Sequence, residues 1–315
     1  MSGKSLRIIL LPNVFRHRCP VSVFLAVFAK YLADCGVLPA SHLNWRLLSD
    51  PRGTVRGEWL KGVEMAAPRL RSLPRNVTDV TRILACVDGA VQNVPLSPNA
   101  ESLQLERTTP VREFCSWPGK RNYEGLYWSS TNRSHVDFES LLEREYLLAA
   151  DAADDIVAIA AQPLALLWPR SISGHRNHVP DFFVRLSSGD GRLVDVRSSE
   201  HVEKNAEQFA LTRGVCEQVG WQYEVFTGLA PLVSANLRWL AGYRHDRSAP
   251  QPDMVEVILG CFDAPIPFSQ ALSRVRSQSG LSAEIAAANL LHLIWRRRLS
   301  IDLHGPLTNA SDVWA

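Results

Sequence analysis

The pattern of apolar and polar residues is clearest in the middle of the chain. Residues 181–186 and 192–198 are short apolar-rich runs that read as strands, and the Ser-Ser-Gly-Asp-Gly segment between them has hairpin-turn composition. Residues 138–153 carry apolar side chains at helical spacing. Residues 156–168 form an extended apolar run that is interrupted at the Gln-Pro step beginning with Gln162. These patterns predict a helix followed by strands.

Helices and strands continue to alternate after the hairpin. Residues 200–218 have helical spacing, and Gly220 marks the predicted end of that helix. A short strand is expected at 222–227 and a further helix at 231–245. The resulting order of elements predicts an α/β core with a mixed central sheet, which we assign to residues 106–248.

The C-terminal part has a different pattern. Residues 248–253 have the composition of a linker. Helical patterns then follow at 254–262, 268–278 and 282–296, before a strand-like segment at 298–303. Three helices followed by a small hairpin are typical of a winged helix, although other small helical bundles share this order. Residues 249–315 are therefore predicted to form a small winged-helix-like α domain.

The N-terminal region, residues 1–105, shows no repeat and no strong period. An accessory domain, a partly ordered extension and translation from a start site upstream of the true one all remain open. The apolar segment 21–29 is too short to span a bilayer and lacks a convincing cleavage site, so a buried helix is favoured over a targeting signal.

Composition adds only broad limits. The chain has 315 residues, is 46% hydrophobic and 21% charged, and carries a net charge of +2, all ordinary for a globular protein. Its six cysteines form no CxxC pair, which argues against a structural zinc site and a dense disulfide framework. A cytoplasmic protein with reduced thiols and no membrane association is expected.

Candidate chemistry lies in the predicted hairpin. Asp195 and Arg197 share one face of their strand, whereas Val194 and Val196 face the opposite layer. Strand pairing through the short turn would bring Asp181 beside Asp195. Two buried carboxylates repel each other unless a counter-charge is present, and Mg²⁺ is a cation that carboxylate oxygens bind. The alternative is a plain cross-strand Asp–Arg pair on a solvated sheet face.

A third acid is expected from the helix at 138–153. Glu143 should lie at the border of its buried face, because it shares a stripe with Leu147. Glu139 and Glu145 are competitors, and helix geometry alone selects none of the three.

Together these residues resemble the PD-(D/E)XK nuclease signature, and more narrowly the TnsA-type endonuclease subunit of heteromeric transposases. The matching motifs are ESLLEREYLLAAD, the Gln-Pro step, HVPDFFV and VDVR. The resemblance implies a restriction-endonuclease-like core. It also implies that Glu143, Asp181, Asp195 and the backbone carbonyl of Val196 bind Mg²⁺ or Mn²⁺. Arg197 stands where the family has lysine; it keeps the positive charge and can bind phosphate but cannot serve as a general base.

The resemblance further implies cleavage of DNA at transposon ends together with a DDE-type transposase, and it allows an AAA+ ATPase regulator as another partner. The C-terminal domain would contact DNA or the transposase, with Arg296, Arg297 and Arg298 suited to phosphate contacts. A solubilising helix end explains these arginines equally well. Two other functions stay open: a catalytically inactive DNA- or partner-binding adaptor, and a stand-alone restriction or repair nuclease.

Two other groups of residues carry side chains that could contact a metal ion or nucleic acid. His175 and His178 both precede Asp181 in the segment SGHRNHVPD, and a phosphate contact or a loop role is favoured over metal ligation. Four aromatic residues occur close together with Lys120 and Arg121 between them, and packing is favoured over nucleic-acid stacking; they are Trp117, Tyr123, Tyr127 and Trp128.

Overall fold

The computed structural model describes residues 72–112, 123–172 and 177–315. All of them lie in the compact unit Met65–Ala315. The expectations for residues 21–29, and for Trp117 and His175, fall outside the described residues. Within the described part of the chain, no helix is long and apolar enough to cross a membrane.

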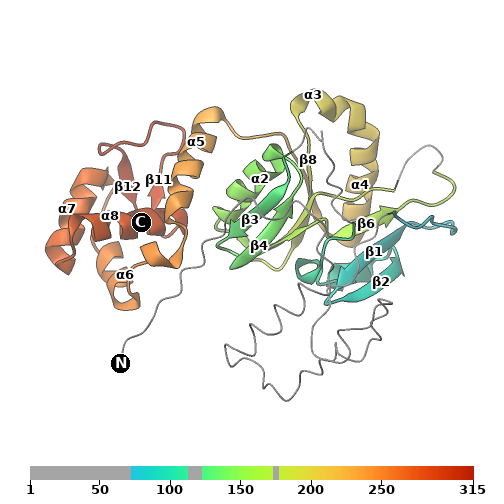
Figure 1. Cartoon of the computed structure of the whole chain (residues 1–315), viewed down its shortest axis with the longest axis horizontal. Helices are drawn as coiled ribbons and strands as arrows, with labels where there is room; N and C mark the ends of the chain where they lie inside the picture. The colour runs from blue at the N-terminus through green and yellow to red at the C-terminus, as the bar shows by residue number, and fades with distance from the viewer. Residues whose placement is uncertain (1–71, 113–122, 173–176) are drawn as a thin grey trace, which may run out of the picture. The chain divides into compact units, whose positions relative to one another are not determined.

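A mixed four-stranded sheet forms the centre of the molecule (Figure 1). Its strands, in spatial order, are β5 (Ile156–Ala161), β7 (Phe182–Leu186), β8 (Gly191–Val196) and β9 (Gln222–Phe226). Strands β5, β7 and β8 pair antiparallel, and β8 pairs with β9 in parallel. The predicted mixed α/β architecture is therefore present.

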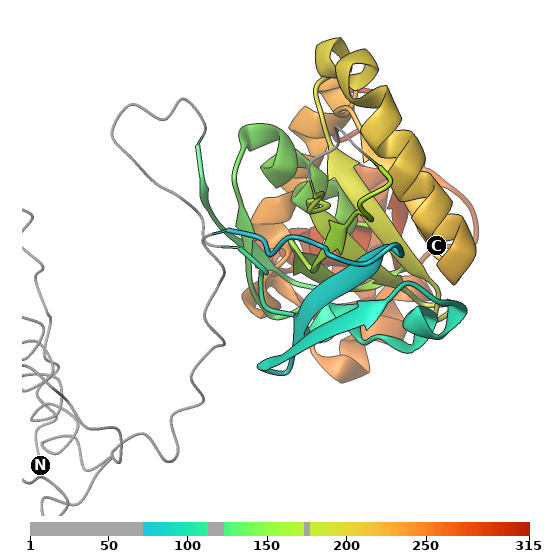
Figure 2. The ribbon, with the colours of Figure 1, turned by 90° about the vertical axis from the view of Figure 1, so that its right-hand side faces the viewer.

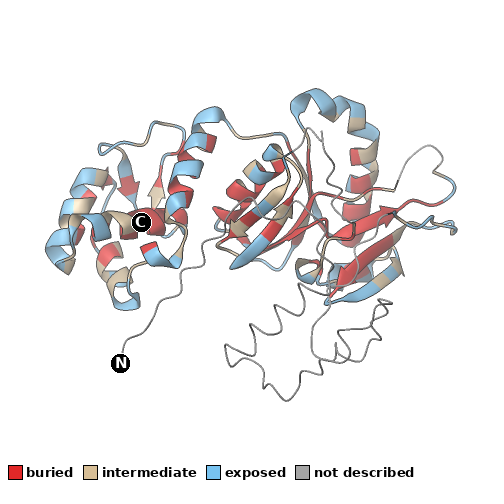
Figure 3. Cartoon of the chain, viewed as in Figure 1, coloured by how far each residue is buried: buried red, intermediate tan, exposed pale blue. Residues whose placement is uncertain are grey.

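Helices cover both faces of this sheet, as Figure 2 shows for α2 (Leu141–Asp151) and α4 (Ala206–Val219). Phe182 and Val194 share one hydrophobic cluster with Leu147 of α2. Phe183 and Leu193 face the other side and share a cluster with Val215 of α4. Because both faces are covered, β7 is almost completely buried along its length (Figure 3).

Local sequence signals set the ends of these helices. Ser140 caps α2, and its side chain accepts a hydrogen bond from the backbone amide of Glu143. The predicted helix at 200–218 is divided into α3 (Ser199–Val202), a 3₁₀ turn and α4. Gly220 ends α4 in the left-handed conformation, with φ of 86°.

A second sheet corrects the prediction for the N-terminal region. Strands β1 (Arg82–Val87) and β2 (Ala90–Pro95) form a hairpin, and β1 also pairs antiparallel with β6 (Leu164–Leu167). Residues 82–95 therefore fold together with the central region, and the division predicted at residue 105 does not separate them. The connecting Asp88 and Gly89 have φ of 48° and 78°, as a two-residue hairpin turn requires.

A further hairpin, β3 (Gly125–Ser129) with β4 (Ser134–Phe138), precedes α2. Strand β4 ends at Phe138, so the helix begins three residues later than the predicted start at residue 138. The helix begins at Leu141 because Ser140 supplies the cap.

The C-terminal part contains helices and one small sheet. The helices are α5 (Pro231–Leu240), α6 (Pro252–Leu259), α7 (Phe268–Ser279) and α8 (Ala283–Trp295). The strands are β10 (Ile266–Pro267), β11 (Ser300–Ile301) and β12 (Asp312–Trp314), with β12 in the middle. Strand β10 precedes α7 and is an addition to the predicted order of three helices and a hairpin.

Candidate active site

The β7–β8 hairpin brings Asp181 and Asp195 together. Phe182 pairs with Val194 and Phe183 with Leu193, so one further step places Asp181 opposite Asp195. The backbone carbonyl of Asp181 accepts a hydrogen bond from the amide of Gln162 (2.8 Å), which fixes the start of the strand. Asp195 is completely buried and Asp181 is 7% exposed. This face of the sheet is therefore not solvated, contrary to the alternative of a surface Asp–Arg pair.

The two oxygens of Asp195 have different surroundings. Oδ2 lies 2.9 Å from Nε2 of His178 and accepts a hydrogen bond from the Tyr223 hydroxyl (2.5 Å). Burial and the nearby Asp195 charge raise the pKa of Tyr223, so its hydroxyl keeps its proton and donates. Oδ1 is buried without a hydrogen-bond partner among the described residues. A buried carboxylate oxygen of this kind is costly unless something else binds it.

Arg197 lies between two of the predicted metal ligands. Its Nη1 donates to the backbone carbonyl of Val196 (2.7 Å) and lies 3.4 Å from Oδ2 of Asp181. The backbone amide of Val196 donates to the same Asp181 oxygen (2.7 Å). The Arg197 side chain is 37% exposed, so solvent reaches it while it compensates the buried carboxylate.

Glu143 is buried at the N-terminus of α2, and both of its oxygens have partners. Oε2 accepts from the backbone amide of Glu139 (2.7 Å), and Oε1 accepts from the Ser140 hydroxyl (2.9 Å). With the Ser140 cap, these contacts form a variant of the capping box in which Glu143 accepts from the amide of Glu139 and the hydroxyl of Ser140. The carboxylate that the family resemblance assigns to a metal therefore also stabilises the helix end.

Electrostatic coupling connects the acids. Burial raises the pKa of Asp181 well above its ordinary value, the Asp195 and Glu143 charges raise it further, and Arg197 opposes them. Burial also raises the pKa of Glu143, where the Glu139 and Ser140 hydrogen bonds and the Arg197 charge act in the opposite direction. The charges of Glu143 and Asp195 thus both act on Asp181, and Arg197 is a counter-charge for Glu143 and Asp181.

The two competing glutamates have other partners. Glu139 pairs with Arg112 and accepts from Nε2 of Gln162 (3.1 Å), so it lies at the border of the site. Glu145 accepts from the Ser234 hydroxyl and from the amide of Leu229 (3.4 Å), which ties α2 to the start of α5. Of the three, Glu143 is the one whose charge acts on Asp181.

The donor chemistry of this site fits a hard divalent cation, because it consists of carboxylate and carbonyl oxygens and includes the unpartnered Oδ1 of Asp195. Among the described residues, however, no group of three or more histidine, cysteine and acidic side chains has the arrangement of a metal site. Both oxygens of Glu143 and Oδ2 of Asp181 accept hydrogen bonds within the chain, so a cation that binds these oxygens would have to share or displace the present donors.

Two supporting residues were not assigned their roles from the sequence. His178 is held by backbone hydrogen bonds to Leu166 of β6, which direct its ring to Asp195. Tyr223 pairs with Leu193 in the parallel register and lies two residues before Val225, the position opposite Asp195. Strand periodicity could have placed Tyr223 on the same face as Asp195 once the parallel pairing of β8 and β9 was known.

The three consecutive arginines near the C-terminus have different environments. Nε of Arg297 donates to the carbonyl of Ala152 (2.7 Å), and burial lowers the pKa of this arginine. Arg298 lies 3.4 Å from Glu256 on the surface. The side chain of Arg296 forms no hydrogen bond or ion pair with another described residue and lines a pocket of about 400 Å³. Of the three, Arg296 is therefore the one whose guanidinium is free to bind another molecule.

The mixed sheet, the helices on both faces and the paired aspartates define an α/β domain consistent with a nuclease fold. The family model described as the TnsA-like endonuclease N-terminal domain matches residues 153–228. Over this segment, which contains β5 to β9 with Asp181, Asp195 and Arg197, the chain resembles the TnsA-type nucleases, and the predicted resemblance is confirmed. Glu143 lies outside the matched residues. No match was found among curated proteins.

Proposed function

We propose that this protein is a metal-dependent DNA endonuclease that cuts at transposon ends together with a DDE-type transposase. The observation that carries the proposal is the pairing of Asp181 and Asp195 inside the segment that resembles TnsA-like endonucleases. An AAA+ ATPase regulator is a further expected partner. The described cysteines Cys86, Cys216 and Cys261 are free, which supports the proposal of a cytoplasmic location.

The proposed roles follow from the contacts of each residue. Asp195 would supply Oδ1, Asp181 a carboxylate oxygen, Glu143 a third carboxylate and Val196 its carbonyl to Mg²⁺ or Mn²⁺. When bound, the cation would lower the pKa of an attacking water and neutralise charge on the phosphate. His178 and Tyr223 would hold the carboxylate of Asp195 in one orientation, as partners of metal ligands do.

Arg197 would bind the phosphate that is cleaved. Its guanidinium is partly exposed and already lies beside Asp181, so an incoming phosphate could reach it without a change in the strand. A guanidinium can donate two parallel hydrogen bonds to phosphate oxygens. Since arginine does not lose its proton, the base that activates water must be another group or bulk solvent.

The C-terminal part would serve as a winged-helix-like domain that contacts DNA or the transposase. The order α6, β10, α7, α8, β11, β12, with β12 central in the small sheet, supports this proposal. Arg296 is one member of the three-arginine cluster that remains proposed as a direct DNA contact. Arg297 would have to give up its hydrogen bond to the Ala152 carbonyl to take part, whereas the pair of Arg298 with Glu256 is exposed and weak, so Arg298 also stays a proposed phosphate contact.

The direct experiment is a cleavage assay on transposon-end DNA with Mg²⁺ or Mn²⁺, with and without the partner transposase. We expect cleavage that requires the partner and is lost in Asp181→Ala. Asp190→Ala, in the exposed turn of the same hairpin, is the matched control and should cut like wild type. Cleavage without the partner would instead indicate a stand-alone nuclease. Absence of cleavage with either metal would contradict an enzymatic function.

One observation favours a second candidate function, that of a catalytically inactive adaptor. Arg197 replaces the family lysine and contacts both Asp181 and the Val196 carbonyl, where it can compete with a cation. In this case DNA and transposase binding would be unaffected by Asp181→Ala. Arg197→Lys separates the two functions. A large increase in the cleavage rate would mean that the guanidinium of Arg197 lowers catalytic activity.

A further inference from the structure

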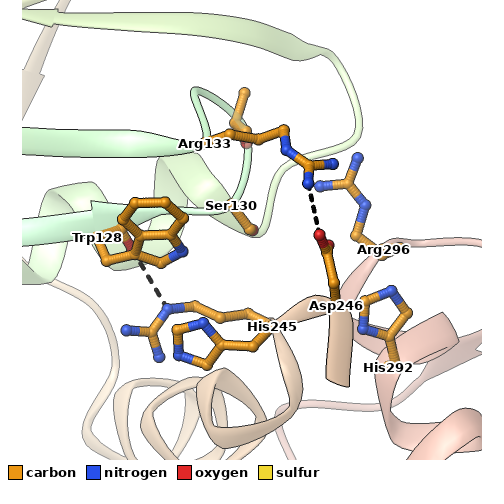
Figure 4. Close-up of a pocket in the computed structure, with 9 residues that line it drawn as sticks. Trp128, Ser130, Arg133, His245, Asp246, His292 and Arg296 are labelled. Atoms are coloured by element: carbon orange, nitrogen blue, oxygen red, sulfur yellow. Dashed lines mark hydrogen bonds and ion pairs between the residues drawn. The ribbon is translucent and has the colours of Figure 1, made fainter. Parts of the chain in front are cut away.

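A second cluster of positive charge lies away from the paired aspartates. It lines the pocket of about 400 Å³ between the β3–β4 turn and the C-terminal helices, shown in Figure 4. Arg133 comes from the turn, Arg244 and His245 from the segment after α5, and His292 and Arg296 from α8 and its end. In Figure 4 the side chains of Arg133 and Arg296 point toward the same space beside Asp246.

The wall formed by the β3–β4 turn is held rigidly. The buried carboxylate of Asp151 accepts from the backbone amides of Ser130 (3.0 Å) and Thr131 (2.7 Å) and from nearby hydroxyl groups. The Ser130 hydroxyl also accepts from Nε1 of Trp295 (3.0 Å), which connects the turn to α8. Two parts of the chain that are far apart in sequence are thereby fixed around one pocket.

The charge of the pocket is predominantly positive. Arg244 donates to the carbonyls of Trp128 (3.3 Å) and Ala241 (2.6 Å), which leaves its charge uncompensated by a carboxylate among the described residues. The guanidinium of Arg296 has no hydrogen-bond or ion-pair partner among the described residues. Asp246 is the one carboxylate in the lining, and its ion pair with Arg133 (2.5 Å) is largely exposed. Exposed pairs of this kind contribute little and can be exchanged for another anion.

The two histidines do not alter this balance near neutral pH. Burial lowers the pKa of His292, and the nearby Arg296 charge lowers it further, whereas its hydrogen bond to the Tyr243 carbonyl has the opposite effect. Burial and the neighbouring Arg244 and Arg247 charges lower the pKa of His245. The positive charge of the pocket therefore comes from its three guanidinium groups.

We propose that this pocket binds a backbone phosphate of DNA, through Arg296 and Arg133, apart from the phosphate that is cleaved. The inference rests on the proposed function, because it takes DNA as the substrate. Guanidinium groups that are exposed and directed into one space suit phosphate oxygens geometrically. Phosphate contacts fix the position of a protein on the duplex without reading its sequence. The pocket would thus position DNA between the central region and the C-terminal helices.

The test is DNA binding by fluorescence anisotropy at several salt concentrations, with the full chain in an Asp181→Ala background. Arg296→Ala should weaken binding several-fold and lower the slope of log affinity against log salt by about 0.9, the value for one lost phosphate contact. Arg247→Ala is the matched control. Arg247 is exposed and follows the pocket residue Asp246 in the sequence, but it does not line the pocket. It should leave the slope unchanged. An unchanged slope for Arg296→Ala would overturn the proposal.

Asp246→Asn is expected to change DNA affinity in the opposite direction. It removes the carboxylate of the lining and frees Arg133, so DNA should bind more tightly, a gain that a folding defect could not produce. Inorganic phosphate distinguishes a site for free anions. If it stabilises wild type against heat while Arg296→Ala leaves DNA affinity intact, the pocket binds a small anion and the proposal is wrong.

These outcomes are separate from those of the cleavage assay. A protein that does not cut DNA but loses the salt-dependent contact in Arg296→Ala would support the pocket and contradict the nuclease function. A protein that cuts DNA and binds it equally well after Arg296→Ala would contradict the pocket alone.

Discussion

Two buried aspartates, Asp151 at the end of α2 and Asp195 in β8, have opposite hydrogen-bond environments. Asp151 is 3% exposed, and donors from the β3–β4 hairpin and its turn occupy both of its oxygens. Asp195 is completely buried, yet His178 and Tyr223 both contact Oδ2 while Oδ1 has no partner among the described residues. The molecule therefore contains one buried aspartate whose two oxygens both accept hydrogen bonds and another that has one oxygen without a hydrogen-bond donor among the described residues.

The difference separates a structural carboxylate from a candidate catalytic one. Neutral hydroxyl and amide donors stabilise the charge of Asp151 at the point where a turn must be held in place. Asp195 lies beside a second buried carboxylate, Asp181, and retains an oxygen that can accept a cation. Burial of an ionisable group is thus insufficient to indicate function. A buried carboxylate oxygen that has no hydrogen-bond donor and lies next to a second carboxylate is a better indicator of a functional site.

The largest expected effect is on cleavage by Asp195→Asn. This variant keeps the shape of the side chain but removes the charge that would bind the cation. Cleavage should fall by more than about 100-fold, beyond the 10- to 100-fold typical of residues that only support a metal ligand. Single-turnover cleavage rates measure it. Asp151→Asn, assayed at a temperature where it is folded, is the comparison and should retain activity; equal losses would remove the distinction.

The second expected effect is on stability. Asp151→Ala leaves several donors of the β3–β4 hairpin without an acceptor, so the free energy of unfolding should fall by about 3 kcal/mol. Urea unfolding followed by circular dichroism measures this change. Asp154→Ala, an exposed aspartate in the next turn, is the control and should change stability little. A small effect of Asp151→Ala would mean that water readily replaces the network.

A smaller effect is expected from Tyr223→Phe. It removes one donor from Oδ2 of Asp195 and should reduce cleavage by about tenfold through poorer orientation of the carboxylate. Binding of Mn²⁺ measured by calorimetry should weaken in parallel. Tyr123→Phe, at an exposed tyrosine, serves as the control. Unchanged metal affinity would show that His178 alone orients Asp195.

The smallest expected effect is a change in the pH dependence of stability, measured by thermal unfolding with EDTA present. The pKa of Asp181 is raised by burial and by Asp195, so the folded state keeps a proton that the unfolded state loses above a pKa of about 4. Stability should therefore fall as pH rises from about 4 through the folded-state pKa. Asp181→Asn should reduce this fall. A slope identical to that of wild type would show that Asp181 is not the responsible group.

Several elements could be predicted from the sequence because their determinants are local. The apolar-rich runs on either side of the Ser-Ser-Gly-Asp-Gly turn predicted β7 and β8, and the hairpin register placed Asp181 opposite Asp195. The β1–β2 hairpin was missed although its Asp-Gly pair is a strong two-residue turn signal. Its strands lie among proline- and arginine-containing segments without a clear period, and the pairing with β6 that stabilises them is distant in sequence.

The sequence alone determined the candidate acids and the order of helices and strands between residues 141 and 240, since periodicity, capping residues and turn residues act over a few neighbouring positions. Only the tertiary structure decided which carboxylate oxygen lacks a hydrogen-bond donor and how His178 and Tyr223 hold Asp195. It also decided which of the three arginine side chains has no partner among the described residues. Those outcomes depend on contacts between side chains that are far apart in the chain. Such contacts arise from strand order and helix packing, which no local pattern specifies.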